Sequence, residues 1–365
     1  MRDVAPDDRP VELTPERARE YVLELGGVSA GGEIAISPLG GGVSNLVYLA
    51  ETDERRYVLK QPRPNLAVED DWPASVSRVH NEARAMRTYD RLLDRRSVGS
   101  RIRSAGSRLR SVSSRVRVPQ VLHEDETNHV VVMEAAPPSA TMWKEELLSG
   151  SVDPTISPVL GAVLGTVHAE TADDPSIAAS FSDRTPFRQL RLEPYHETTA
   201  RRHPDVAETI FAEARRLEET ERTLVHGDFS PKNVLVDRNG PEVELWLLDF
   251  EVCHWGDPAF DSAFMLNHLL IKSVFNRESV EEFHESARAF WNTYDEVAPW
   301  DVETETVREL GVLMLARVDG KSPVEYVTTE PVADALRSIA KTLLRSEATE
   351  IEAVFEVVSE AVDSL

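Results

Sequence analysis

Two short polar motifs, each bordered by apolar strand-like runs, constrain this chain more than any other feature. The first is the run at 226–233, His-Gly-Asp-Phe-Ser-Pro-Lys-Asn, and the second is Asp249-Phe-Glu251, sixteen positions further on. Apolar runs precede the first motif and separate it from the second, so both motifs fall where strands meet polar loops. We therefore expect their carboxylate and amide side chains to lie close together at neighbouring strand ends.

The side chains of these motifs are those that phosphoryl transfer requires. Mg²⁺ prefers hard oxygen ligands, which Asn233, Asp249 and Glu251 can supply. Asp228 is the candidate base, because an aspartate at such a site can accept the proton of an attacking hydroxyl. Lys232 is either a surface residue or a phosphate contact, and the sequence does not decide between them. Together the motifs predict an enzyme that uses ATP and Mg²⁺.

A strand lysine and a helix glutamate predict the other half of such a site. Lys60 ends an apolar strand-like run and is one of only six lysines in the chain, and Glu82 lies on the helix that follows. In kinases this ion pair directs the lysine to the ATP phosphates. A glycine turn between two earlier strands can approach phosphate closely, although such glycines more often form plain hairpin turns. The turn comprises Gly40, Gly41 and Gly42, with Asn45 just after it.

The order of apolar patterns predicts an α+β chain with two lobes. Strand-like runs, a helix from about 76 to 93, and two more strands at 118–122 and 130–133 make a small antiparallel-sheet N-lobe over residues 1–136. Pro137-Pro138 is a natural hinge, because proline restricts itself and the residue before it. Residues 137–365 form a larger, mainly helical C-lobe, with its last long helices expected at about 258–275, 279–296, 303–318 and 331–364.

The composition is strongly acidic: 64 Asp and Glu oppose 40 Lys and Arg, giving a formal charge of −24, and 34 of the 40 are arginine. An acidic, lysine-poor surface is typical of a halophilic protein, because a large net charge maintains solubility. A chain that binds basic partners is the alternative, but the usual acidic block is missing.

The single cysteine, Cys253, excludes an intramolecular disulfide. No apolar run approaches a membrane span, and the acidic field repels polyanions. We expect a cytoplasmic protein that binds neither membrane nor nucleic acid.

The segment at 95–117 departs from this composition, with eight arginines and no acidic residue. Glycines and many serines weaken a helix there, yet apolar residues recur at spacings of four and three. A solvated insertion, a helical arm that packs on an acidic surface or on a second subunit, and weak anion binding all stay open. The second of these would fit a homodimer. The apolar ladder, an a/d pattern, consists of Val98, Ile102, Ala105, Leu109, Val112 and Val116.

These motifs resemble those of the aminoglycoside phosphotransferase and choline kinase superfamily, and most of all those of 5-methylthioribose kinase. The Asp-Phe-Glu at 249–251 resembles that family's Asp-Pro-Glu, and the strand at 58–61 resembles its Val-Val-Lys-Gln. The resemblance covers most of both lobes and implies a protein-kinase-like bilobal fold. It also implies that Trp72 belongs to a lid near the substrate, that Met133 and Glu134 precede adenine, and that Arg317 faces the acceptor.

Two positions depart from the methylthioribose kinases. Ala316 stands where that family has the first of two arginines, and the loop Phe-Ser-Pro-Lys-Asn is closer to the wider superfamily. Salt-adapted archaea are expected to contain related kinases for ribose 1-phosphate, so the resemblance implies a pentose-type acceptor, phosphorylated or not. A phosphate-bearing sugar needs further cations, which Arg317, Lys232 or the arginine segment could supply. We predict ATP-dependent transfer to a sugar hydroxyl. The alternatives are an aminoglycoside- or choline-type kinase, a protein kinase and a non-catalytic nucleotide-binding sensor.

Overall fold

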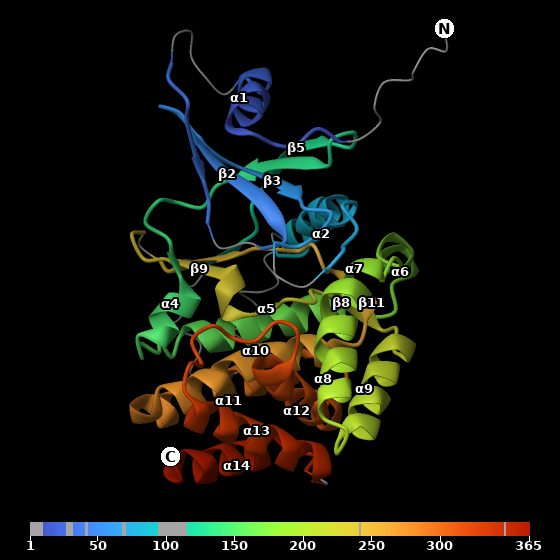
Figure 1. Cartoon of the computed structure of the whole chain (residues 1–365). Coiled ribbons are helices and arrows are strands. Elements are labelled where there is room, and N and C mark those ends of the chain that lie inside the picture. Colours follow the sequence, from blue (N-terminus) through green and yellow to red (C-terminus); the bar gives the residue numbers. More distant parts are fainter. Residues whose placement is uncertain are drawn as a thin grey trace, which may run out of the picture.

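The structure is a computed structural model, and it describes residues 10–26, 32–40, 43–67, 71–93, 115–240, 242–346 and 348–365. Figure 1 shows an N-lobe containing a sheet, drawn above a larger and mainly helical C-lobe. The predicted α+β class with two lobes is therefore confirmed. The boundary between 136 and 137 stays a prediction: β6 (Val130–Glu134) ends just before it, and α4 (Trp143–Leu148) begins shortly after it.

The N-lobe is built on a five-stranded antiparallel sheet in the order β1-β2-β3-β6-β5. Val130 and Val132 of β6 pack in a cluster with α1, whereas Val131 and Met133 pack in the cluster that contains α2. This division follows from strand geometry, since successive side chains point to opposite faces of a sheet. The remaining elements are α1 (Pro15–Glu24), β1 (Ala35–Pro38), β2 (Asn45–Glu51), β3 (Arg56–Pro62), α2 (Arg78–Leu93) and β5 (Val121–Asp125).

The chain between α2 and β5 departs from the prediction of one strand at 118–122. β5 closes the N-lobe sheet, but a separate strand, β4 (Arg115–Arg117), runs parallel to β10 (Glu244–Leu247) in a C-lobe sheet. Val116 pairs with Leu245, and the guanidinium of Arg117 lies 4.8 Å from the centre of the Trp246 ring. The last member of the apolar ladder is thus a strand residue, so the helical interpretation is wrong at this point. The other five members lie outside the described residues.

In the C-lobe, helices surround two small sheets with the strand orders β4-β10-β9-β7 and β11-β8. The long helix predicted at 331–364 is two helices, α13 and α14, because Ser346 adopts an extended conformation that ends the first. None of the described helices is both long enough and apolar enough to cross a bilayer. The further elements are β7 (Thr141–Met142), α5 (Ile156–Thr171), α6 (Pro175–Ser180), α7 (Thr185–Phe187), η2 (Arg188–Glu197), α8 (Thr198–Arg202), α9 (Ala207–Glu219), β8 (Thr223–Val225), η3 (Pro231–Asn233), β9 (Val234–Asp237), β11 (His254–Gly256), α10 (Pro258–Phe275), η4 (Arg277–Ser279), α11 (Val280–Val297), α12 (Glu303–Asp319), α13 (Glu330–Arg345) and α14 (Ile351–Asp363).

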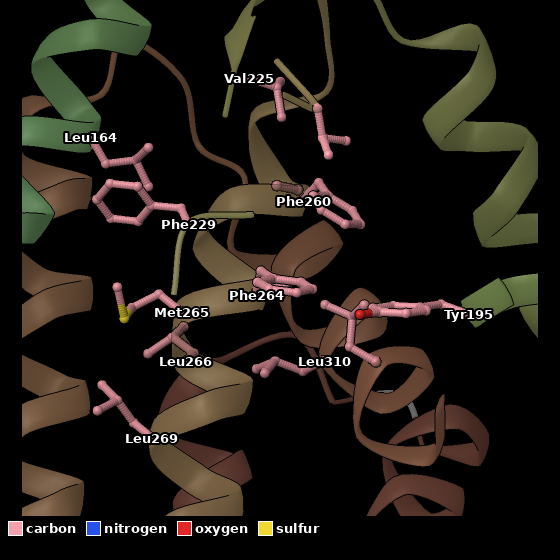
Figure 2. Packing of buried hydrophobic residues seen from close by; sticks show 14 of the residues in the cluster. Leu164, Tyr195, Val225, Phe229, Phe260, Phe264, Met265, Leu266, Leu269 and Leu310 are labelled. Atoms are coloured by element: carbon pink, nitrogen blue, oxygen red, sulfur yellow. The ribbon is translucent and has the colours of Figure 1, made fainter. Parts of the chain in front are cut away.

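Helix α10 runs through the core of the C-lobe and supports the first motif. Figure 2 shows Phe260, Phe264 and Leu266 along this helix, with Phe229 of the motif loop packed beside it. Nearly every side chain of α10 is buried, which explains its continuous apolar run. Because the helix is held on all sides, it offers a rigid base for the residues that precede β9.

Candidate active site

A buried charge cluster joins the two lobes through β3, α2 and the second motif. Lys60 Nζ lies 2.9 Å from Glu82 Oε2, 2.6 Å from Asp249 Oδ1 and 3.6 Å from Glu251 Oε2. Burial lowers the pKa of Lys60, but the three carboxylates outweigh burial and raise this pKa well above its ordinary value. The structure thus brings together the strand lysine, the helix glutamate and both acidic residues of the second motif.

Glu251 is held by two further N-lobe side chains. Its Oε2 accepts hydrogen bonds from Asn45 Nδ2 at 3.0 Å and from Arg78 Nε at 3.2 Å. Arg78 has 0% of its surface exposed, and its guanidinium also donates to the carbonyl oxygens of Ser44 and Ser75. Sequence reasoning missed Arg78; its one signal is its place four residues before Glu82, on the same face of α2. Gly40 is described and makes no such contact, while Gly41 and Gly42 lie outside the described residues.

The acidic side of this cluster suits a divalent cation. Oxygen atoms of Glu82, Asp249 and Glu251 all lie within 4.8 Å of one another. Among the residues that the structure describes, only Lys60 and Arg78 form ion pairs with these three carboxylates, and hard oxygen ligands with surplus negative charge are what Mg²⁺ prefers. Asp249 also has a φ of 65°, a left-handed conformation that costs a residue with a side chain about 1–3 kcal/mol and is frequent at functional sites.

Asp228 of the first motif is surrounded by cations and an amide. Its Oδ1 is 3.0 Å from Arg191, and its Oδ2 is 2.8 Å from both Lys232 Nζ and Asn233 Nδ2. Asn233 therefore directs its amide nitrogen to Asp228, which leaves its amide oxygen as the group available to a metal. Lys232 contacts Asp228 while its side chain stays 44% exposed, so a phosphate contact by this residue stays a prediction.

Arg191 is the second residue that sequence reasoning missed. It lies in η2, a π-helix with Pro194 inside it, and such wide turns are often found at functional sites. The Arg191 side chain donates to the Gly227 carbonyl at 2.7 Å as well as contacting Asp228. Burial lowers the pKa of Arg191, but the carboxylate of Asp228 outweighs it, so the pKa is raised. No periodic pattern marks this residue, because its role depends on a contact between η2 and a loop 36 positions away.

Backbone contacts with α10 fix the loop that carries Asp228. The two carboxylate oxygens of Asp261 accept the N–H groups of His226 at 2.6 Å and Gly227 at 2.8 Å. Gly227 has a φ of 76°, and a Cβ there would lie 2.8 Å from the Val252 carbonyl oxygen. A glycine is therefore required on two grounds: the left-handed backbone and the close approach of the loop after Glu251.

We expect Gly227→Ala to lower the free energy of unfolding by roughly 1–3 kcal/mol, because alanine is strained in the left-handed region and its Cβ would press on Val252. Chemical denaturation monitored by circular dichroism measures this change. Gly40→Ala is the matched control, since a Cβ at Gly40 meets nothing within 4 Å. Equal stability of the two variants would contradict the proposed strain.

A cavity of about 320 Å³ lies beside Asp228 and extends between the lobes. Trp72, Lys232 and Arg317, the three predicted substrate residues, all line it. Trp72 is anchored to the C-lobe, because its Nε1 donates to the Gln189 carbonyl at 2.9 Å. Other lining residues are Leu190, Arg191, Tyr195, Asp228, Asp249, Glu251, Phe264, His268, Lys321 and Ser322.

Met133 and Glu134 lie at the end of β6 and are not part of this cavity lining. The N–H of Glu134 donates to the Gln120 carbonyl at 2.9 Å. The N–H of Ala135 donates to the Arg56 carbonyl. These two donors are already engaged within the protein, so the place of adenine beside β6 stays a prediction.

Comparison with known proteins identifies the family. Residues 35–300 match the model of the phosphotransferase enzyme family, also named APH. The chain belongs to this family. The predicted membership of the aminoglycoside phosphotransferase and choline kinase superfamily, and the prediction of a phosphotransferase, are confirmed at the level of this family. The nearer resemblance to methylthioribose kinase and an origin in a salt-adapted archaeon stay predictions.

Individual relatives are distant. A 4-hydroxytryptamine kinase of Psilocybe cyanescens is 23% identical over 244 residues, which are 61% of this chain and 62% of that protein. The chain thus matches less than two thirds of that relative's length. Among solved structures, an amicoumacin kinase in complex with AMP-PNP and Ca²⁺ has a TM-score of 0.51 at 15% identity, covering 92% of this chain and 97% of that one. A spectinomycin phosphotransferase with ADP and spectinomycin has a TM-score of 0.46 at 14% identity, covering 97% and 98%. The amicoumacin kinase shares the fold predicted as protein-kinase-like.

Proposed function

We propose that this protein transfers the γ-phosphoryl group of ATP to a hydroxyl of a pentose-type sugar, such as ribose 1-phosphate or a methylthioribose-like acceptor. The observation that carries this proposal is that both charge clusters described above reach one cavity between the lobes. Asp249 and Glu251 line this cavity together with Asp228, Arg191 and Lys232, and Lys60 pairs with Asp249 behind the lining.

In this proposal each side chain has a role that follows from its contacts. Asp228 accepts the proton of the acceptor hydroxyl and orients its oxygen, while Arg191 and Asn233 keep the carboxylate in place. Lys60, held by Glu82, positions the phosphates of ATP. Asn233, Asp249 and Glu251 would hold Mg²⁺, whose charge would offset that of the transferred phosphoryl group. Trp72 closes the cavity from the N-lobe side, which would exclude water.

The charge of the cavity favours a sugar over a cationic acceptor. The three carboxylates of the lining all have cationic partners: Arg191 and Lys232 for Asp228, Lys60 for Asp249, and Arg78 for Glu251. An aminoglycoside or a choline needs carboxylates without such partners, because burying an unpaired ammonium group is costly. Polar hydroxyls of a sugar suit this lining better.

A screen of acceptors tests the proposal. Release of ADP is measured in high KCl with Mg·ATP and, in turn, ribose, ribose 1-phosphate, methylthioribose, choline and an aminoglycoside. We expect the highest kcat/KM with a pentose-type acceptor, and a turnover lowered by about 10²–10⁴-fold in Asp228→Asn prepared in the same way, which controls for contaminating kinases. A higher kcat/KM for choline or the aminoglycoside, or binding of ATP with no transfer to any acceptor, would contradict the proposed function.

Cytoplasmic location, halophilic character and a homodimer stay predictions from the sequence.

A further inference from the structure

We infer that the acceptor carries an anionic group, and that His268 and Arg317, with Lys272 behind them, form a subsite that binds this group away from the transferring oxygen. The inference rests on the proposed transfer to an acceptor hydroxyl at Asp228. It selects, among pentose-type acceptors, those with a phosphate or a similar anion. It also assigns a role to two side chains of α10, His268 and Lys272, that the proposed chemistry does not use.

The subsite lies along one face of α10. Phe264, His268 and Lys272 are spaced by four residues, which places them one above another on the same side of a helix. Phe264 and His268 line the cavity, and their rings are 5.1 Å apart. Figure 2 shows Phe264 beside Tyr195, whose ring is stacked 6.2 Å from it.

This column of side chains begins near the catalytic aspartate and leads away from it. The guanidinium of Arg191, which contacts Asp228, lies 5.5 Å from the centre of the Phe264 ring. One helical turn carries the column about 6 Å further, to His268. A small sugar could therefore present a hydroxyl at Asp228 and a second group at His268.

Two buried polar atoms in this wall have no hydrogen-bond partner among the described residues. His268 is 5% exposed, and its Nε2 forms no hydrogen bond there; the Nε of Arg317 is buried and equally unpartnered. Buried polar atoms nearly always find a partner, so two such atoms in one cavity wall indicate a missing ligand. Arg317 is preorganised for one, because its Nη1 is held by the Tyr195 hydroxyl and by Ser322.

The charge of this wall is positive and uncompensated. Arg317, Lys321 and Lys272 have hydrogen bonds but no ion pair among the described residues. Lys272 is 1% exposed, and within the described part of the chain its ammonium contacts only the His268 carbonyl at 3.2 Å and the Tyr326 hydroxyl at 3.5 Å, with the Tyr326 ring 5.2 Å away. An isolated buried ammonium is costly, and a bound anion would supply the counter-charge that the fold leaves out.

Nearby cations contribute to the pKa shifts of three neighbouring groups, and they outweigh burial in one of them, Tyr195. Burial, then Lys144 and Arg317, lower the pKa of Lys272 to about 7, although Glu325 and Glu145 act in the opposite direction. Burial, with Lys272 and Arg317, holds the pKa of His268 well below its usual value. For Tyr195 burial would raise the pKa, yet Arg317 and Arg191 outweigh it and the pKa is lowered. An anion is the ligand that such a field selects.

Inorganic phosphate is the probe that tests the subsite directly. Its binding to the full-length protein is measured by titration calorimetry at constant KCl for the wild type, Lys272→Met and Arg317→Gln. We expect each variant to bind phosphate about tenfold or more weakly, because Arg317→Gln removes a charge-assisted contact and Lys272→Met removes a buried positive charge behind it. Lys341→Met is the matched control, because Lys341 is a surface lysine of α13 paired with Asp205. Phosphate that does not bind the wild type, or binds all four proteins equally, would overturn the subsite.

Steady-state kinetics separates the subsite from the proposed function. Lys272→Met should raise KM for a phosphorylated pentose about tenfold, with kcat and the KM for ATP close to wild type and with no change for an unphosphorylated pentose. An equal rise in KM for the phosphorylated and the unphosphorylated pentose would show that Lys272 has only a structural role, and would contradict the inference. If phosphate binding depends on Lys272 but no sugar is phosphorylated, the subsite stands and the proposed acceptor fails. Should Lys272→Met not fold, His268→Gln takes its place in both assays.

Discussion

Replacing Asp228 by asparagine is expected to lower kcat by about 10²–10⁴-fold, the usual contribution of a positioned general base. Asparagine keeps the shape of the side chain, and so the contact with Asn233 can persist, but it cannot accept a proton from the acceptor hydroxyl. Nucleotide affinity should stay near the wild-type value, because Lys60, Glu82 and Asp249 form a separate cluster. Single-turnover kinetics and fluorescence binding of an ATP analogue measure the two quantities.

The same substitution also changes the charge of the cavity in a direction that can be checked. Without the carboxylate of Asp228, Arg191 and Lys232 lose their counter-charge. An anionic acceptor should then bind at least as tightly as to the wild type, even though it is not turned over. Asp205→Asn, at an exposed position paired with Lys341 and Arg345, should retain full activity. Wild-type kcat in Asp228→Asn would remove this residue from the chemistry.

Arg78→Met is expected to lower the free energy of unfolding by about 3–5 kcal/mol, the cost of breaking a buried ion pair by removing one partner. Arg78 is wholly buried, and its loss would remove the guanidinium that pairs with Glu251 and one of the donors to the carbonyl oxygen of Ser44. Urea denaturation followed by circular dichroism gives the free energy of unfolding.

Arg87→Met is the control on the same helix. Arg87 is 51% exposed and pairs with Glu124 at the surface, and an exposed pair of this kind is worth about 0–1 kcal/mol. Similar losses of stability in Arg78→Met and Arg87→Met would show that the buried pair does not hold the lobes together. Because Arg78 also fixes Glu251, we expect Arg78→Met to raise the Mg²⁺ concentration needed for half-maximal activity.

Features within one short stretch of chain could be predicted from the sequence. Asp228 and Asn233 lie in a single loop between β8 and β9, so their proximity depends on a few backbone dihedrals and not on the rest of the fold. The Lys60–Glu82 contact was predictable for a related reason: a strand followed by its packed helix leaves few ways for the two side chains to point. Arg317 and Trp72 were placed by resemblance alone, and the cavity brings them together.

Other features resisted prediction because they depend on partners far apart in the sequence. The strand pairing of Val116 with Leu245 opposes the helical pattern of its own neighbourhood, since burial against β10 outweighs a weak local propensity. The division between α13 and α14 was missed for the opposite reason: both halves are amphipathic, and the short extended link at Ser346 carries no proline or glycine signal.

The two polar motifs by themselves determined that phosphoryl transfer is the predicted chemistry, because the residues proposed to bind a metal and accept a proton are specified by their type and local spacing. The tertiary structure alone decided what surrounds that chemistry. Arg191, Arg78 and His268 come from three separate helices, and their positions beside Asp228, Glu251 and the cavity follow from packing. The sign of an electrostatic field depends on all charges within several ångströms, so only the folded chain shows that this acidic protein gathers cations along one wall of its cavity.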